Sequence, residues 1–548
     1  MNKAVAWSLA LVVAVLLFAP VRRVYPQSQT TSPRYVPGQL LVKLKTGVAD
    51  TGEIPEFIAH SRGDVEPLQK SERGDLLLVT LDGVTVEDAA AQLAQDARVE
   101  YAEPNYLWHA AATPNDALFF QQYALMNTGS FLGGKPGADI NATAAWDITT
   151  GSDNLAVAVL DAGVDLSHPD LAPNAWTNSR EIPGNGIDDD GNGYVDDVHG
   201  WNYVTNSPKV YDNPSNDWHG THVAGAVGAA GNNQIGVTGV AWHVKLMAMK
   251  FLGPQTGSTA DAVKAINYVI DQKKRGVNVR VINASWAGTS ESLALKNAII
   301  DAGNNGILFV CAAGNADGGN NGSDLSDEPV YPAAWSADVP TIIAVAAADN
   351  NDRLASFSNY GLTRAQVAAP GVNTMSTTPD GGYGFGVGTS MASPVVAGVA
   401  ALLFAHEPSL TPAAARTRIV KTADPQPTLA GRLASAGRIN AYQALTNTVP
   451  HAPSRPAIGT VLVTKKLVVV DGIGFGMGGA VIEANGVGLA KSRVNTDVTL
   501  ADGSSAELLA KLGKPGINAT FPSGVAVTVT VYNPATGERS EPFTYTRK

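Results

Sequence analysis

Cysteine is nearly absent from this 548-residue sequence: Cys311 is the only one, so no disulfide can form within the chain. Charged residues are also scarce, at 16%, and the net charge of −11 is spread without acidic or basic blocks. A chain without a basic stripe lacks the electrostatic footprint of a nucleic-acid-binding protein. We therefore expect no nucleic-acid partner, and we expect packing or metal ions to provide the stability that disulfides do not.

Only one apolar run is a candidate for crossing a membrane. It covers residues 4–19, follows Lys3 and precedes the pair Arg22 and Arg23. A membrane span needs about 20 apolar residues, so this shorter run is typical of a signal-peptide core. We predict a signal peptide over residues 1–27, a secreted protein (extracellular or periplasmic), and no stable membrane insertion. An uncleaved membrane anchor is the alternative.

Three motifs with polar residues stand out from the otherwise apolar, glycine-rich sequence. Asp161-Ala162-Gly163 ends an apolar run, HGTHVAG covers residues 219–225, and GTSMASP covers residues 388–394. A serine hydroxyl attacks efficiently only when a histidine takes its proton and a carboxylate orients that histidine. The order Asp, His, Ser is that of the subtilisin arrangement and differs from the chymotrypsin and α/β-hydrolase orders.

With these three motifs, the sequence resembles the subtilase (subtilisin-like, peptidase S8) family of serine proteases over about residues 114–447. The resemblance implies a catalytic triad of Asp161, His219 and Ser390. Each residue alone has an ordinary structural interpretation, because a lone serine before a helix is usually an N-cap and an aspartate after a strand is often a turn residue. The hypothesis therefore depends on the three motifs together.

The resemblance also implies an oxyanion hole and a substrate-binding segment. Asn315, within the family signature A-A-G-N, and the Ser390 backbone N–H would be the oxyanion donors. The predicted substrate-binding residues are Ser285, Trp286, Ala287 and Gly314. Two positions depart from the family: Ala162 replaces a Ser or Thr whose hydroxyl can hold the catalytic carboxylate, and Ala287 replaces a glycine facing the P1 pocket.

Strand-like and helix-like segments alternate between residues 155 and 447. The expected strands cover residues 244–249, 279–282, 307–312 and 341–346, and the expected helices cover 260–274 and 292–302. Such alternation predicts an α/β fold, a parallel sheet with helices on both faces. We also expect His219 at the N-terminal end of a helix over 219–231, Ser390 at the start of a helix, and Pro394 in its first turn.

The peptidase domain, predicted over residues 111–447, is flanked by two smaller units. Residues 28–110 predict a small α+β unit that resembles the inhibitory propeptide of subtilases, with cleavage expected between His109 and Thr113; a permanent N-terminal domain is the alternative. A proline-rich linker follows at residues 448–456. Residues 457–548 have the short strands and turns of a β-sandwich, and their wording resembles the immunoglobulin-like TIG (IPT) domain.

An inserted acidic loop, NGIDDDGNGYVDD over residues 185–197, alternates oxygen-bearing side chains around glycines. This is how an EF-hand-like loop collects ligands for Ca²⁺, and subtilases often carry calcium. The predicted ligands are Asp188, Asp190, Asn192, Tyr194 and Asp196. The match is partial, because position 12 counted from Asp188 is His199 and not a bidentate Glu. An exposed acidic turn is the alternative.

Taken together, these features predict the secreted zymogen of a subtilisin-like serine endopeptidase. Its partners would be protein or peptide substrates and its own propeptide, which acts as an intramolecular inhibitor. We expect a monomer with structural Ca²⁺ and no organic cofactor. The alternative is a catalytically weak or inactive protease-like protein that binds or adheres to surfaces, an interpretation supported only by Ala162 and Ala287.

Overall fold

The computed structural model describes residues 35–45, 65–69, 74–81, 84–93, 95–106, 113–254, 256–316, 321–450, 456–476, 479–495, 498, 505–534 and 538–548. The predicted signal peptide, nearly all of the predicted cleavage segment and most of the predicted linker lie outside these residues. The chain forms two compact units, residues 1–110 and residues 111–548.

The N-terminal unit is an antiparallel sheet with one helix. Its strands lie in the order β2 (Val65–Gln69), β3 (Leu76–Thr80), β1 (Tyr35–Leu44), β4 (Val99–Tyr106), and its helix is α2 (Val86–Leu93). Leu40, Val42 and Val79 are fully buried, so alternate strand residues form the core. The α+β prediction for this unit is confirmed.

A nine-stranded sheet forms the centre of residues 111–447. Its order is β14-β15-β11-β10-β9-β8-β5-β7-β6, and all neighbours are parallel except the pair β14–β15. The strands are β5 (Gly151–Asp161), β6 (Gly200–Asn202), β7 (His243–Lys250), β8 (Val279–Ala284), β9 (Leu308–Ala312), β10 (Ile342–Ala348), β11 (Val367–Pro370), β14 (Asp424–Pro425) and β15 (Gly437–Arg438). The predicted α/β class is confirmed.

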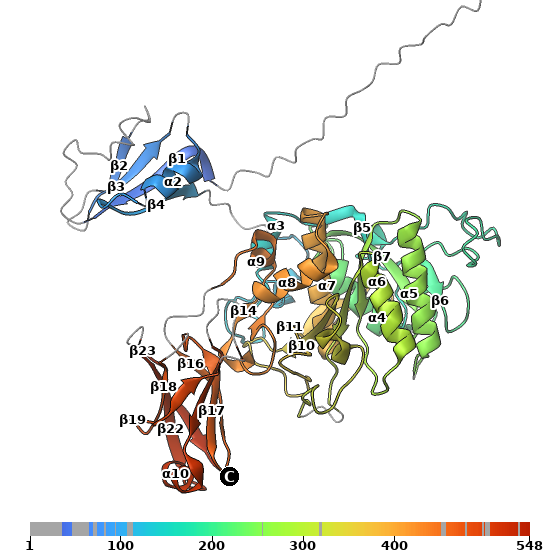
Figure 1. Cartoon of the computed structure of the whole chain (residues 1–548). Coiled ribbons are helices and arrows are strands. Elements are labelled where there is room, and N and C mark those ends of the chain that lie inside the picture. The colour runs from blue at the N-terminus through green and yellow to red at the C-terminus, as the bar shows by residue number, and fades with distance from the viewer. Residues whose placement is uncertain are drawn as a thin grey trace, which may run out of the picture. The chain divides into compact units, whose positions relative to one another are not determined.

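Helices cover both faces of this sheet because its central strands are apolar on both sides (Figure 1). Along β5, Leu155, Val157 and Val159 belong to one core, which includes α4 (Pro214–Gly228) and α7 (Thr389–His406). The alternate residues Ala156 and Leu160 belong to the second core, which includes α5 (Thr259–Lys274) and α6 (Leu293–Asn304). The period of two residues in a strand thus divides the domain into two layers of helices.

Shorter elements complete the domain. They are α3 (Ala142–Trp146), α8 (Pro412–Lys421), α9 (Ala441–Thr446) and the 3-10 helices η1 (Phe119–Gln121), η2 (Ala172–Asn174), η4 (Ala333–Ala337) and η5 (Pro427–Leu429). A hairpin of β12 (Thr374–Thr378) and β13 (Gly382–Gly386) packs on α4, where Gly225 leaves room for the Thr377 and Ser376 hydroxyls.

The order of the strands fixes where a site can form. Strand β5 lies between β7 and β8, so the chain leaves β5 toward one edge of the sheet and later continues through β8, β9 and β10 toward the other. In open α/β sheets, sites form at such a switch point, beside the carboxyl ends of the strands. Asp161 is the last residue of β5.

Two details of the helices differ from the sequence prediction. Helix α4 begins at Pro214, capped by the Asn213 side chain, so His219 lies in its second turn and not at its N-terminal end. Pro394 is the sixth residue of α7 and not in its first turn. Because Pro394 has no N–H to donate to the Ser390 carbonyl, that oxygen instead accepts a hydrogen bond of 2.7 Å from Ser285 Oγ.

Helix α7 is the one helix among the described residues that is long and apolar enough to span a membrane. It is a core helix, because 83% of its apolar window is buried inside the protein.

The C-terminal residues form two antiparallel sheets around a shared core. One has the order β16 (Ala457–Val463), β17 (Leu467–Ile473), β21 (Glu507–Lys511), β20 (Ser492–Val494). The other contains β19 (Val487–Gly488), β18 (Val481–Ala484), β22 (Ala526–Asn533) and β23 (Glu538–Arg539), with β24 (Phe543–Thr546) also on β22. A short helix, α10 (Gly513–Thr520), was not predicted. A β-rich unit is confirmed, while the TIG resemblance stays a prediction.

Candidate active site

The Asp161 carboxylate and the His219 imidazole are joined by a short hydrogen bond. His219 Nδ1 donates to Asp161 Oδ1 at 2.6 Å, and the Ala162 N–H donates to the same oxygen at 2.7 Å. Asp161 is fully buried, whereas the His219 side chain is 23% exposed. The bond favours the tautomer that carries its proton on Nδ1, which leaves Nε2 free to accept a proton.

Two opposing effects act on the pKa of His219. Burial of the ring disfavours its charged form, but the negative charge of Asp161 and the hydrogen bond to it outweigh burial and raise the pKa above its ordinary value of 6.5. Asp161 thus favours the charged form of the His219 ring.

Asp161 Oδ2 has no hydrogen-bond partner among the described residues, although it is buried. This is the position that a Ser or Thr hydroxyl at residue 162 would be expected to serve, and Ala162 supplies none. A buried charged oxygen without a donor is costly. The Asp161 carboxylate is therefore held through Oδ1 alone.

A second buried carboxylate anchors the turn of α4 that carries His219. Asp217 accepts from Lys250 Nζ at 2.6 Å and from the backbone N–H groups of Asp212 and Asn213 at 2.9 and 3.0 Å. Lys250 also bonds Asp212 Oδ1 at 2.5 Å. Sequence analysis missed this cluster, because nothing local indicates that Lys250, at the end of β7, would be buried beside α4.

Ser390 is the second residue of α7 and is half-buried. The neighbouring Met391 side chain and the His222 ring both approach Gly386, where an added Cβ would lie 2.8 Å from each, so the turns of α4 and α7 that carry His219 and Ser390 approach each other there. No hydrogen bond joins His219 to Ser390 within the described part of the chain, and such bonds often tighten only when substrate binds.

His222 has a structural role. Its Nε2 lies 3.1 Å from the Thr374 carbonyl and 3.2 Å from the Gly384 carbonyl, both in the hairpin β12–β13. Burial lowers its pKa to about 4, so the ring stays neutral and tethers the hairpin to α4.

The Asn315 side chain is oriented by Thr389. Both the Thr389 backbone N–H and its hydroxyl donate to Asn315 Oδ1, at 3.0 and 2.9 Å. With its oxygen occupied, the amide must direct Nδ2 elsewhere. Asn315 is exposed, so Nδ2 is available as a donor to a ligand.

Gly388 keeps a space open beside both expected oxyanion donors. A Cβ added to Gly388 would lie 3.4 Å from Asn315 Nδ2, 3.6 Å from the Ser390 backbone nitrogen and 3.9 Å from Ser390 Oγ. Its φ of +143° also disfavours any other residue. The donors and the nucleophile thus surround one small volume at the start of α7, where the helix leaves backbone N–H groups unpaired.

The four predicted substrate-binding residues have different surroundings. Ser285 is buried and its hydroxyl bonds the Ser390 carbonyl, while Trp286 Nε1 donates to the Leu160 carbonyl at 3.0 Å. Ala287 is exposed, and its Cβ would lie 3.7 Å from a Cβ added to Gly314. The structure therefore brings Ala287 and Gly314 together and leaves Ser285 and Trp286 with structural side chains.

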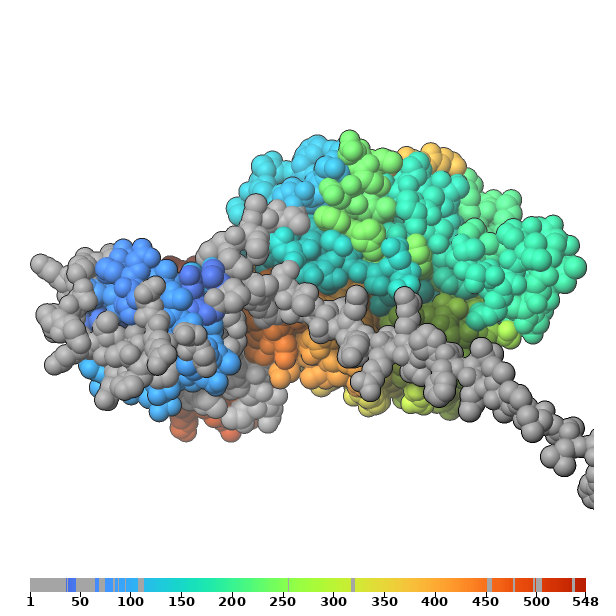
Figure 2. Space-filling view, turned by 90° about the horizontal axis from the view of Figure 1, so that it is seen from above, coloured from blue at the N-terminus to red at the C-terminus, as the bar shows by residue number. Residues whose placement is uncertain are grey.

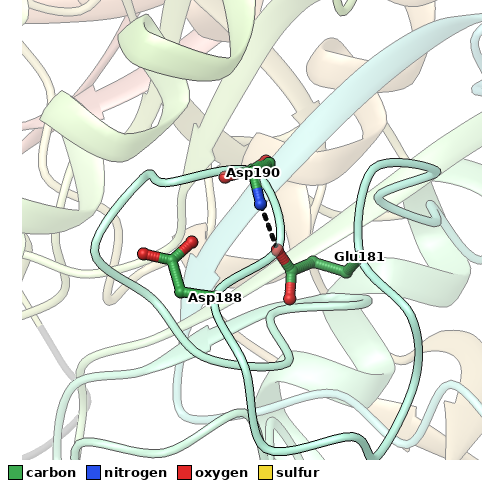
Figure 3. Close-up of side chains that lie close together, drawn as sticks. All are labelled: Glu181, Asp188 and Asp190. Atoms are coloured by element: carbon green, nitrogen blue, oxygen red, sulfur yellow. Dashed lines mark hydrogen bonds between the residues drawn. The ribbon is translucent and has the colours of Figure 1, made fainter.

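The acidic loop precedes β6 at the edge of the sheet (Figure 1), and in Figure 2 the teal residues of this region form one end of the peptidase domain. Three carboxylates, of Glu181, Asp188 and Asp190, have oxygens within 4.8 Å of one another (Figure 3). Glu181 was not predicted, because it lies seven residues before Asp188 and outside the alternating pattern.

The other predicted ligands make hydrogen bonds within the loop. Asp196 accepts from the backbone N–H groups of Asn185 and Gly186 at 3.1 and 3.0 Å. Asn192 Oδ1 accepts from the Tyr194 N–H at 2.7 Å, and its Nδ2 donates to Asp197 at 2.8 Å. These bonds shape the loop without bringing Asp196 into the carboxylate cluster.

The donor set of this cluster fits a hard cation. Asp190 Oδ1 is buried and has no hydrogen-bond partner among the described residues, although Arg275 Nη1 lies 3.7 Å away. Three carboxylates against one guanidinium leave an excess of negative charge, and oxygen donors are those that Ca²⁺ prefers. An unpaired buried carboxylate oxygen is what a cation bound here would satisfy.

Comparisons with known proteins agree with this geometry. The subtilase family matches residues 152–455, and the fervidolysin N-terminal prodomain matches residues 23–105. The thermophilic serine proteinase of Bacillus sp. (strain AK1) is 36% identical over 75% of this chain and 88% of its own length. The extracellular protease of Xanthomonas campestris pv. campestris is 36% identical over 67% of this chain and 63% of its own length.

A solved structure, titled "Proteases from Pseudoalteromonas arctica PAMC 21717", has 31% sequence identity, covers 61% of this chain and 99% of that one, and has a TM-score of 0.48. The family match covers more than half of the chain, and the first relative is 36% identical over three quarters of it. The chain belongs to the subtilase family, with a subtilisin-like protease domain behind an N-terminal prodomain.

Proposed function

We propose that this subtilase is a secreted serine endopeptidase that processes its own precursor and hydrolyses peptide bonds through an acyl-enzyme on Ser390. The observation that carries the proposal is the space beside Gly388, bordered by Asn315 Nδ2, the Ser390 N–H and Ser390 Oγ. An oxyanion formed there would be within reach of two donors at once.

Each step uses one group of this site. His219 Nε2 takes the proton of Ser390 Oγ as the oxygen attacks the scissile carbonyl, and Asp161 stabilises the resulting imidazolium. Asn315 and the Ser390 N–H stabilise the tetrahedral oxyanion. His219 then gives the proton to the leaving amine, and a water deprotonated by the same ring hydrolyses the acyl-enzyme.

The acyl half of a substrate would lie extended beside residues 285–287 and Gly257, gaining affinity from main-chain hydrogen bonds. Because the Ser285 and Trp286 side chains already have protein partners, their backbone groups would be the contacts. The exposed Ala287 methyl, beside Gly314, would narrow the P1 pocket.

We assign the acidic loop as a Ca²⁺ site in which Glu181, Asp188 and Asp190 provide carboxylate oxygens. Asn192, Tyr194 and Asp196 remain candidate ligands through side-chain or backbone oxygens. The ion would be structural: it would neutralise the cluster and hold the loop against the sheet edge, and it would take no part in the acyl transfer.

The prodomain, residues 28–110, would inhibit the peptidase of residues 111–447 until cleavage between His109 and Thr113. A linker of residues 448–456 would lead to the β-rich domain of residues 457–548. The predicted signal peptide supports a secreted location, extracellular or periplasmic, and we expect a monomer.

Active-site labelling distinguishes this function from the alternative of an inactive surface-binding protein, which the unpaired Asp161 Oδ2 favours. A fluorophosphonate probe should label the native protein at Ser390 and abolish hydrolysis of casein, whereas Ser390→Ala should neither be labelled nor hydrolyse. A folded native protein that takes up no label would reject the enzymatic function.

A further inference from the structure

An exposed aromatic surface lies beside the start of α7. Phe120 and Phe385 are 61% and 45% exposed, and they belong to segments more than 250 residues apart in the sequence. Phe131 connects them: its ring stacks on Phe385 with centroids 6.0 Å apart and meets Phe120 edge-on at 5.9 Å. We call these three residues the aromatic tract.

Exposed aromatic rings in contact are costly in water unless they meet a partner, and here Phe120 and Phe385 are exposed while Phe131 is half-buried. Leu132 and Val387, which are 45% and 53% exposed, add further apolar area from the same two segments.

The tract is continuous with the catalytic residues. Phe385 lies in β13, which runs into Gly388 and then Ser390. On the α4 side, the exposed Trp218 ring meets His219 edge-on at 5.6 Å and His222 at 6.2 Å, and His222 is bonded to the β13 carbonyl of Gly384. Apolar side chains therefore continue from the general base to the hairpin.

The topology places this surface on the side of the leaving group. The segments expected to hold the acyl half, at Gly257 and residues 285–287, lead into α5 and α6 on one face of the sheet. The hairpin β12–β13 packs on α4, on the opposite face. A chain that crosses Ser390 from the first face must leave past His219, which protonates the new amine.

We propose that the aromatic tract, with Trp218 and Val387, binds apolar side chains on the primed side of the substrate. This inference rests on the proposed peptidase function. The two centroid separations of 5.9 and 6.0 Å allow the tract to follow at most about 12 Å, or roughly three to four residues, of an extended chain. Substrates with Leu, Met or Phe at these positions would be preferred over those with Ser or Asp.

Acyl transfer to added amines tests the primed side alone. A peptide ester with a small alcohol as its leaving group acylates Ser390 without using the tract. The acyl-enzyme is then divided between water and a nucleophile, either Ala-Leu-Leu-amide or Ala-Ser-Ser-amide. Attack of the amine forms a C–N bond and breaks the C–Oγ bond, while His219 moves the proton from the amine to Ser390 Oγ.

We expect the native enzyme to prefer the Leu nucleophile by about tenfold over the Ser nucleophile. Phe385→Ser and Phe131→Ser should reduce this preference to about twofold or less, and Phe385→Leu should keep most of it. Tyr442→Ser, which removes a 38% exposed aromatic ring from α9, is the matched control and should change nothing. Without an added nucleophile, consumption of the ester by the folded Tyr442→Ser variant should equal that of the native enzyme.

The outcomes separate the two proposals. No ester turnover in the native protein would refute the peptidase function itself. Normal turnover with equal use of both nucleophiles would overturn the primed-side assignment alone. A Phe385→Ser variant that keeps the preference but loses self-association in sedimentation would also overturn it and would identify the tract as a contact between copies.

Discussion

Replacing Asn315 removes one of the two proposed oxyanion donors, and the structure gives a graded series of substitutions for this test. Asn315→Ala deletes Nδ2 together with the Oδ1 that accepts from Thr389. Asn315→Asp keeps the acceptor but replaces the donor with a negative charge. Thr389→Val leaves Asn315 intact and removes only the hydroxyl bond of 2.9 Å that helps to orient it.

The expected magnitudes differ because each change removes a different interaction. One oxyanion donor contributes about 2.7–4 kcal/mol to the transition state, so Asn315→Ala should lower kcat by about 10²–10³ with little change in KM. Asn315→Asp should be at least as severe, because a carboxylate opposes the oxyanion. Thr389→Val costs one neutral hydrogen bond of about 0.5–1.5 kcal/mol, and the backbone N–H still holds the amide, so kcat should fall by about 2–12-fold.

Steady-state hydrolysis of a peptide p-nitroanilide measures these effects, with active sites counted by fluorophosphonate labelling. Labelling also shows that each variant is folded. The assignment of Asn315 would be refuted if Asn315→Ala raised KM and left kcat unchanged, because an oxyanion donor acts in the transition state. A Thr389→Val variant as impaired as Asn315→Ala would show that orientation and donation cannot be separated at this site.

Three further perturbations test other parts of the site. In the pH profile of kcat/KM, the acidic limb should lie above pH 6.5, and the rate should decline as the pH falls through the raised pKa of His219, because the neutral ring is the proposed base. An Asp161→Asn variant should shift this limb to lower pH. Native and variant profiles that coincide would contradict this prediction. Ala162→Ser should provide a hydrogen-bond donor for Asp161 Oδ2. A charge-assisted hydrogen bond contributes about 1.5–3 kcal/mol, and if half of this energy stabilises the transition state, kcat/KM should rise by up to about tenfold. An unchanged kcat/KM would mean that Oδ2 is already solvated. If free Ca²⁺ is held at 100 times the Kd of the site, its removal by a chelator should lower the free energy of unfolding by about 2.7 kcal/mol, or the Tm by on the order of 5 °C. The Glu181→Gln variant should not respond to the chelator in this way. A native protein whose Tm does not change with chelator would show that the loop is an acidic turn.

Much of the fold is predictable from local pattern. The strands β7, β8, β9 and β10 begin and end within two residues of the expected positions, because each is a short, mostly apolar run. The start of α4 was not predicted, because the alanine-rich part of the sequence begins only at residue 223. In the structure, the helix starts with Pro214 and is capped by Asn213.

The residues of the candidate site that belong to sequence motifs could be predicted, whereas those that reach the site through long-range packing could not. The sequence motifs predict Asp161, His219, Ser390 and Asn315. The orienting role of Thr389 depends on a contact across 74 residues, and Glu181 joins Asp188 only because the loop folds back. No local pattern encodes either contact.

The most direct test of the account is the intact mass of the purified precursor, followed over time with calcium, beside a Ser390→Ala copy that cannot form an acyl-enzyme. The account predicts cleavage between residues 109 and 113 in the native chain alone. A native chain that stays whole while folded, or an equal cut in the Ser390→Ala copy, would contradict it.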